Sequence, residues 1–213
     1  PPTGSPVAAN GHLATDGNHI VNENGEPIQL RGVATHGLQW RGDFYENGEA
    51  IEAAAEEWGA DVIRLTVYVY EGGYLDNETL TPEDFDVMID GIVQSCIRSG
   101  IYCIIDWHVH HPGDPAFYLD DAKEFFDKMS RKYAGVPNLI YEIANEPNPT
   151  GLEGVVEGHY IEWDEIVSYS DEVIPIIRAN SPKSLVLVGT PSWSSFGQSS
   201  KRDWREIVDN PLD

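Results

Sequence analysis

Basic residues, cysteines and long apolar runs are all scarce in this chain of 213 residues. Lys and Arg number 13 against 36 Asp and Glu, which gives a formal net charge of -23 at pH 7. Such a surface repels phosphate groups, so we expect neither nucleic acid nor a membrane as a partner. No stretch approaches the roughly 18 uninterrupted apolar residues of a membrane span. No charged segment followed by an apolar run opens the chain, and we expect any signal peptide to have been removed.

The two cysteines, Cys96 and Cys103, are too few for a disulfide framework and lack the Cys/His spacing of a zinc site. Cys96 falls on the apolar stripe of a predicted helix, and Cys103 falls inside the next predicted strand. Packed layers lie about 10 Å apart, whereas the Cα atoms of a disulfide lie within about 7 Å. We therefore expect two buried thiols, with a disulfide as the less favoured alternative.

The excess of acidic groups has two interpretations, a surface kept soluble in high salt or an ordinary acidic secreted protein. Only five of the basic residues are lysines, which favours the first interpretation. Hydrophobic residues make up 41% of the chain and aromatic residues 10%, enough for a sizeable core. The sequence thus predicts a secreted globular protein, and we interpret its surface as halotolerant.

Short apolar segments alternate with helical patterns along most of the chain. Their continuous apolar runs are typical of strands buried on both faces. The predicted strands are 28–33, 62–67, 101–107, 139–144 and 185–190. The predicted helices are 48–58, 81–100, 118–133 and 160–179. Residues 1–20 lack apolar periodicity and are predicted to be an N-terminal lead-in across the bottom of the fold.

Alternating strands and helices predict right-handed crossovers and a parallel sheet. This pattern leaves two α/β architectures open, a doubly wound sheet or a closed (β/α)8 TIM barrel. Eight units at the observed spacing need roughly 300 residues, and this chain holds five. We expect residues 1–213 to form a single domain, which is either an open sheet or the first part of a barrel.

Polar and aromatic residues follow the predicted strands, where parallel α/β sheets build their ligand sites. They are His36 after the first strand, Arg64 and Tyr68 on the second, His108 after the third, Asn145 and Glu146 after the fourth, and Trp193 after the fifth. Arg64 alone fits a structural ion pair equally well, because a buried guanidinium requires a carboxylate with or without chemistry.

Three histidines, His108, His110 and His111, invite a metal interpretation because His-x-His at a strand end can bind zinc. No further Cys, His or Asp completes the set in the sequence pattern. We therefore predict no metal and no cofactor.

The segment 139–148, an apolar strand ending in Asn145-Glu146-Pro147, resembles the signature of glycoside hydrolase family 5. Four other segments resemble that family in the right order, namely 31–33 with 35–40, 62–64, 104–108, and 188–190 with Trp193. The resemblance is closest to the bacterial endoglucanases (cellulases). It implies a TIM barrel, of which this chain carries about the first five β/α units.

The resemblance also implies retaining, endo-acting hydrolysis of β-1,4-glucan, with a β-glucan polysaccharide or cellooligosaccharide as substrate. Glu146 matches the acid/base, and Asn145 matches the neighbour that binds the sugar 2-hydroxyl. Arg64 and His108 match the groups that orient the carboxylates. The positions that match sugar contacts, or that present aromatic faces to sugar rings, are His36, Trp40, Tyr68 and Trp193.

The nucleophilic glutamate of that family follows its seventh strand, which has no counterpart in this sequence. Glu142 lies about 13 Å from Glu146 along the same strand, outside the roughly 5 to 5.5 Å of a retaining pair. Asp106 is interpreted as a buried structural partner. We expect this chain to be inactive alone and the complementary C-terminal segment to supply the nucleophile. The alternatives are a non-catalytic carbohydrate-binding fragment, or a hydrolase of mannan, xylan or mixed-linkage glucan.

Overall fold

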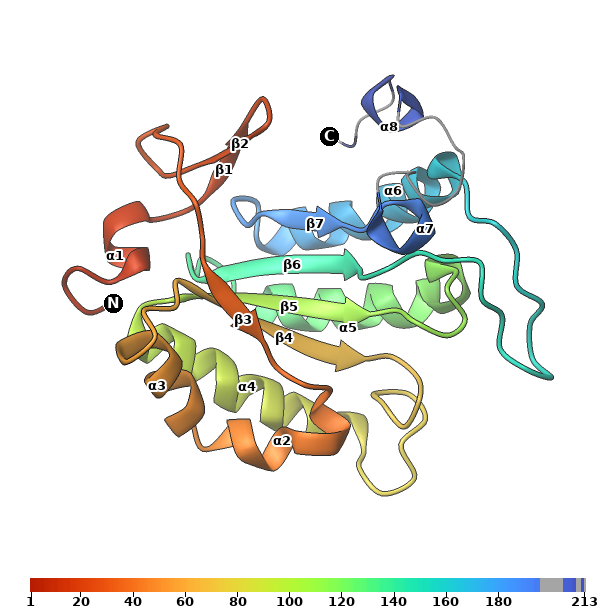
Figure 1. Ribbon diagram of the computed structural model, residues 1–213, viewed down its shortest axis with the longest axis horizontal. Coiled ribbons are helices and arrows are strands. Elements are labelled where there is room, and N and C mark those ends of the chain that lie inside the picture. The colour runs from red at the N-terminus through yellow and green to blue at the C-terminus, as the bar shows by residue number, and fades with distance from the viewer. Residues whose placement is uncertain (196–204, 210–211, 213) are drawn as a thin grey trace. The chain divides into compact units, whose positions relative to one another are not determined.

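The computed structural model describes residues 1–195, 205–209 and 212 (Figure 1). The chain divides into two compact units, and the division passes through strands β5 and β6. The first unit comprises residues 1–106, 135–141 and 182–185. The second comprises residues 107–134, 142–181 and 186–213.

One five-stranded sheet carries the strands in chain order, β3-β4-β5-β6-β7. Strand β3 pairs with β4 in parallel, with Gly32 opposite Val62 and Ala34 opposite Arg64. A doubly wound sheet reverses its strand order at a switch point, whereas this order continues in one direction as in a barrel. The strands are β3 Gly32–Ala34, β4 Val62–Tyr68, β5 Tyr102–His108, β6 Leu139–Ala144 and β7 Val186–Val188.

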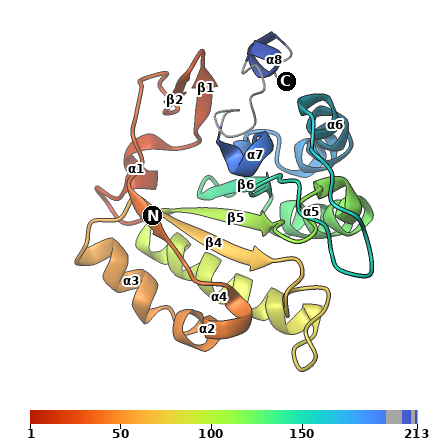
Figure 2. The same ribbon diagram turned by 45° about the vertical axis from the view of Figure 1, so that its right-hand side comes forward.

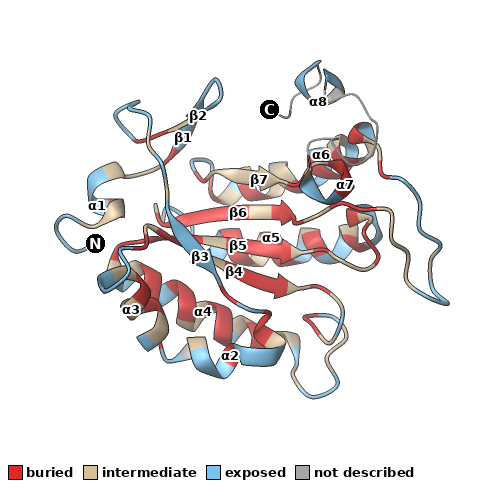
Figure 3. Ribbon diagram, in the orientation of Figure 1, coloured by how far each residue is buried: buried red, intermediate tan, exposed pale blue. Residues whose placement is uncertain are grey.

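Three helices, α2 Leu38–Glu46, α3 Glu49–Glu56 and α4 Pro82–Ser99, pack against one another in the first unit. Helix α4 begins as predicted, because Thr81 and Asp84 form a capping box in which each side chain accepts the other's backbone N–H. Its apolar stripe is buried, as the red segments of α4 show in Figure 3. Helix α2 was not predicted.

The N-terminal lead-in is more regular than predicted. It forms helix α1 Pro6–Asn10 and an antiparallel hairpin of β1 Ala14–Asp16 and β2 His19–Val21. Within the first unit, the Tyr102 hydroxyl at the start of β5 donates to the Gly11 carbonyl at 2.8 Å; that the segment lies across the bottom of the fold stays a prediction. The hairpin was missed because strands of three residues are too short to establish a periodicity.

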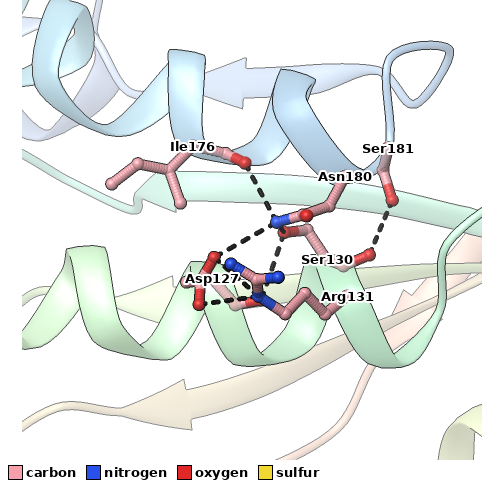
Figure 4. Close-up of polar contacts among 6 residues, drawn as sticks. All are labelled: Asp127, Ser130, Arg131, Ile176, Asn180 and Ser181. Atoms are coloured by element: carbon pink, nitrogen blue, oxygen red, sulfur yellow. Dashed lines mark hydrogen bonds and ion pairs between the residues drawn. The ribbon is translucent and has the colours of Figure 1, made fainter.

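In the second unit, helices α5 Leu119–Lys132 and α6 Trp163–Asn180 lie side by side (Figures 1 and 2). Asn180 joins them, since its amide nitrogen donates to Asp127 at 3.2 Å and to Ser130 at 3.0 Å (Figure 4). Arg131 holds the other side of Asp127 at 2.9 Å. The shorter elements of this unit are η1 Pro115–Tyr118, α7 Pro191–Ser194 and α8 Arg205–Asp209.

Both cysteines are buried and free, as predicted. The Cys96 thiol makes a hydrogen bond with that of Cys103, and this contact together with burial raises the pKa of Cys96 well above its ordinary value. Among the described helices, none has the length and apolar character that a bilayer crossing requires.

Candidate functional site

Arg64, near the middle of β4, forms an ion pair with Asp106 on β5 in the first unit. Arg64 Nη2 lies 2.9 Å from Asp106 Oδ2, and the Asp106 side chain is fully buried while that of Arg64 is 25% exposed. A buried carboxylate needs such a partner to offset its lost hydration. The structural interpretation of Asp106 is therefore confirmed, and the pair fixes the position of the Arg64 guanidinium relative to β5.

The end of β3 is joined to β4 by a reciprocal pair of threonines. The Thr66 N–H donates to Thr35 Oγ1 at 3.0 Å, and Thr66 Oγ1 donates to the Thr35 carbonyl at 3.1 Å. The Thr35 N–H in turn donates to the Arg64 carbonyl at 2.8 Å. These buried bonds continue the ladder past the last residue of β3 and so fix the start of the loop that carries His36.

His36, Trp40 and Tyr68 form an aromatic cluster in the first unit. The ring centroids of His36 and Trp40 lie 4.9 Å apart, and those of Trp40 and Tyr68 lie 5.0 Å apart, both edge to face. Trp40 is 49% exposed. Gly37 permits this packing, since a Cβ there would lie 2.9 Å from atoms of both Trp40 and Tyr68. The cluster exposes aromatic surface through Trp40, and that these residues contact sugar stays a prediction.

The His36 ring also has a defined tautomer. The Gly37 N–H donates to His36 Nδ1 at 2.7 Å, so in the neutral ring the proton sits on Nε2. The His36 backbone N–H donates to the Tyr45 hydroxyl at 3.1 Å. Nε2 is therefore the nitrogen of the neutral ring that can donate a hydrogen bond.

His108, Asn145 and Glu146 come together in the second unit, at the ends of β5 and β6. Asn145 is buried, and its Nδ2 lies 3.3 Å from His108 Nε2 and 3.5 Å from the Val109 carbonyl. An amide nitrogen only donates, so this contact makes His108 Nε2 the acceptor and places the ring proton on Nδ1. The half-buried Glu146 follows directly. This unit thus presents an amide, an imidazole and a carboxyl group at adjoining positions.

All three carbonyls of the tripeptide 145–147 accept hydrogen bonds from neighbouring groups. The first accepts from Ser194 Oγ at 2.7 Å, the second from Asn148 Nδ2 at 2.8 Å, and the third from the Trp193 N–H at 3.0 Å. The tripeptide is therefore held through its backbone carbonyls.

Trp193 lies in α7, where three successive residues adopt left-handed backbone. The φ angles of Ser192, Trp193 and Ser194 are +61°, +58° and +55°. Such angles are strained for residues other than glycine, and strain of this kind concentrates at functional sites. The Trp193 side chain is 44% exposed, and its predicted contact with sugar stays a prediction.

The predicted site residues fall into two groups, one in each compact unit. The first unit holds His36, Trp40, Arg64 and Tyr68. The second unit holds His108, Asn145, Glu146 and Trp193.

His110 and His111 lie in the same loop after β5, with ring centroids 4.2 Å apart. That these histidines hold no metal stays a prediction.

Two residues that hold the tripeptide, Asn148 and Ser194, were not predicted. Asn148 carries a local signal, because an Asn two residues before a Thr favours a turn in which the Asn side chain accepts the later backbone N–H. That bond is present, from the Thr150 N–H to Asn148 Oδ1 at 3.0 Å. Ser194 carries no such signal, since its partner Asn145 is 49 residues away.

Comparisons with known proteins agree with this arrangement. Residues 21–213 match the family model Cellulase (glycosyl hydrolase family 5). Endoglucanase E-5 of Thermobifida fusca is 40% identical over 212 residues, and endoglucanase CelA of Streptomyces lividans is 40% identical over 210 residues. The crystal structure of the catalytic domain of the Thermobifida fusca endoglucanase Cel5A superposes with a TM-score of 0.86 at 39% identity. A variant of that domain in complex with cellotetraose gives a TM-score of 0.85.

These relatives are longer than this chain. The alignments cover 100% and 99% of the chain but 42% of each of the two endoglucanases. The superposition covers 99% of the chain and 64% of the Cel5A catalytic domain. The chain therefore carries part of a (β/α)8 barrel, which confirms the predicted fold class.

Proposed function

Because the chain belongs to the cellulases of glycosyl hydrolase family 5, we propose that it serves retaining, endo-acting hydrolysis of β-1,4-glucosidic bonds in cellulose or related β-glucans. The observation that carries this proposal is the pairing of Asn145 with His108 directly beside Glu146. The Asn145 amide is fixed by the His108 ring at the end of a barrel strand, and the half-buried Glu146 follows it. This arrangement suits a site that protonates a glycosidic oxygen.

Each group has a role in this reaction. Glu146 donates its proton to the leaving oxygen and then accepts one from the attacking water. Asn145 binds the sugar 2-hydroxyl, a contact that strengthens in the oxocarbenium-like transition state. His108 orients Asn145 through the bond at 3.3 Å. Arg64, fixed by Asp106, supplies a positive charge that orients a carboxylate.

A retaining mechanism needs a second carboxylate about 5 to 5.5 Å from the first. Glu142 lies on β6, and Glu146 stands four residues later, just beyond the end of that strand; an extended segment of four residues spans about 13 Å. Asp106 is engaged with Arg64. We therefore assign the nucleophile to a complementary C-terminal segment of the barrel, and the 64% coverage of the Cel5A domain supports this assignment. On this proposal the present chain alone is inactive.

The proposed substrate is a β-glucan chain or a cellooligosaccharide. Support comes from the aromatic cluster of His36, Trp40 and Tyr68, whose rings suit the apolar faces of pyranose units, and from the cellotetraose bound to the related catalytic domain. Mannan, xylan and mixed-linkage glucan are the competing substrates, and parallel assays on each polymer distinguish them.

Secretion and salt tolerance are also part of the proposal. Their support is the formal net charge of -23 with only five lysines, a composition that keeps a protein soluble where salt screens charge.

The test is hydrolysis of carboxymethylcellulose by the complete gene product, with Glu146→Gln as the critical variant. The loss of a general acid is expected to lower kcat on the order of 100- to 10,000-fold. Glu172→Gln is the matched control, since Glu172 lies on α6 with its side chain 55% exposed and pairs with Lys123. Binding of cellooligosaccharides without hydrolysis by the complete protein would favour the carbohydrate-binding alternative.

A further inference from the structure

Asn148, two residues after Glu146, uses the whole hydrogen-bonding capacity of its side chain within the second unit. Its Nδ2 donates to the Glu146 carbonyl at 2.8 Å and to the His110 carbonyl at 3.2 Å. Its Oδ1 accepts from the Thr150 N–H at 3.0 Å and from the Thr150 hydroxyl. Asn148 is only 1% exposed. The buried carboxamide of Asn148 thus links two loops, one that follows β5 and one that follows β6.

The backbone strengthens the same link. The Asn148 N–H donates to the Gly113 carbonyl at 3.1 Å, and the Gly113 N–H donates to the Thr150 carbonyl at 2.9 Å. Gly113 also allows the loops to approach closely, since a Cβ there would lie 2.2 Å from the Asn148 carbonyl oxygen and 2.3 Å from its Oδ1. The two loops are therefore joined at both the side-chain and the backbone level.

The joined loops carry the chemistry of this unit. The loop after β5 begins directly after His108, and the loop after β6 carries Asn145 and Glu146. We propose that Asn148 is a positioning residue, which fixes the Glu146 carboxyl group relative to His108 by holding the Glu146 carbonyl and the opposite loop together. Its effect on catalysis rests on the proposed function, whereas the joining of the loops does not.

The contacts explain why this position requires asparagine. Aspartate keeps the acceptor for Thr150 but has no N–H groups for the Glu146 and His110 carbonyls, and its charge faces both of them. Alanine removes all four bonds and leaves buried polar groups without partners. Both changes are expected to loosen the two loops, with Asn148→Asp retaining part of the turn.

The experiment compares Asn148→Ala and Asn148→Asp with the unmodified complete protein on two substrates. Cellotetraose has a poor leaving group that needs the proton of Glu146, whereas a dinitrophenyl β-cellobioside has a leaving group that needs none. Displacement of an acid by about 1 Å costs on the order of 100-fold. We expect kcat on cellotetraose to fall 10- to 100-fold, with a much smaller loss in the glycosylation rate of the activated substrate.

Asn180→Ala is the matched control. Asn180 is also a bonded amide in the second unit, donating to Asp127, Ser130 and the Ile176 carbonyl between α5 and α6 (Figure 4). This variant is expected to lower the melting temperature and to leave kcat on both substrates unchanged. Equal losses on the two substrates in the Asn148 variants, or no loss at all, would overturn the positioning role.

Amide hydrogen exchange provides a readout that does not depend on activity. Exchange at the backbone N–H groups of Gly113 and residue 148, which bond across the two loops, is expected to accelerate at least about 10-fold in Asn148→Asp, and unchanged exchange there would refute the joining of the loops. If the unmodified protein hydrolyses no glucan while exchange accelerates, the proposed function fails and the loop contact stands. If Asn148→Ala does not fold, Asn148→Asp and the exchange measurement still decide the question.

Discussion

Separating Arg64 from Asp106 is expected to produce the largest stability loss of any single change at the site. Asp106 is fully buried and its Oδ2 lies 2.9 Å from Arg64 Nη2, while the Arg64 side chain is 25% exposed. Arg64→Met therefore leaves a buried carboxylate without its counter-charge. Asp106→Leu leaves a guanidinium that reaches water and can regain part of its hydration. The two changes should thus be unequal.

The magnitudes follow from this asymmetry. Breaking a buried pair by removing one partner costs about 3–5 kcal/mol, which we assign to Arg64→Met. At this chain length 1 kcal/mol corresponds to about 2–4 °C in Tm, so the variant should melt roughly 6–20 °C lower. Replacing both partners with apolar residues is often close to neutral. The double variant should therefore be more stable than Arg64→Met alone, with a coupling of about 3 kcal/mol or more.

The assay is urea unfolding of the complete protein, followed by tryptophan fluorescence, for the four members of this double-mutant cycle. Equal slopes against urea concentration would show that the variants unfold from comparable states. A loss below about 1 kcal/mol for Arg64→Met, within the range of exposed ion pairs, would refute the structural role of the pair. Additive losses in the double variant would refute the coupling.

Three further predictions concern the sugar surface, the charge and the helix interface. Trp40→Ala, which removes a ring that is 49% exposed, should raise the KM for cellooligosaccharides about 10-fold with little change in kcat; a fall in kcat alone would exclude a binding role. Because the net charge is -23, raising NaCl from about 0.1 M to about 1 M should raise Tm by screening repulsion, and an unchanged Tm would refute halotolerance of this origin. The hydrogen bond from Arg131, and to a smaller extent the one from Asn180, lowers the pKa of Asp127. The stabilising effect of the Asp127 carboxylate is therefore fully present above the pKa that Asp127 has in the unfolded chain. It is lost as the pH falls through the lower pKa that Asp127 has in the folded protein. Asp127→Asn should show a smaller loss of Tm in acid than the unmodified protein, and identical acid profiles would contradict this linkage.

The elements that the sequence predicted well are those whose ends are marked by local sequence signals. Strand β6 was predicted with its observed bounds, because its apolar run is closed by polar residues on both sides. Helix α4 was predicted because a capping box opens it and Gly100, at a φ of +70°, ends it. Helix α2 was missed, since Gly37 caps it without a side-chain hydrogen bond and its residues carry little amphipathic pattern. Strand β3 begins at Gly32 rather than at residue 28, because its extent is set by pairing with β4.

The same distinction holds for the site. His108, Asn145 and Glu146 were predicted because each stands at the end of an apolar strand. Their partners depend on tertiary contacts, as with Ser194, which reaches the Asn145 carbonyl across 49 residues of sequence. Sequence position identifies groups capable of chemistry, but the groups that hold them are set by which loops the fold brings together.

Hydrogen bonds to its backbone hold the Asn-Glu-Pro tripeptide in place, and this determines how substitutions in the neighbouring loops affect the site. Its three carbonyls are held by Asn148, Trp193 and Ser194, so the support engages the backbone and places no demand on the Glu146 carboxyl group itself. A support made through the carboxylate would compete with proton transfer and shift the charge state on which the proposed chemistry depends. Backbone support avoids that conflict, because Asn148 bonds to the Glu146 carbonyl and not to its carboxyl group. Substitutions in the supporting loops should therefore change the rate through the geometry of Glu146, because they remove contacts of its backbone and none of its carboxyl group.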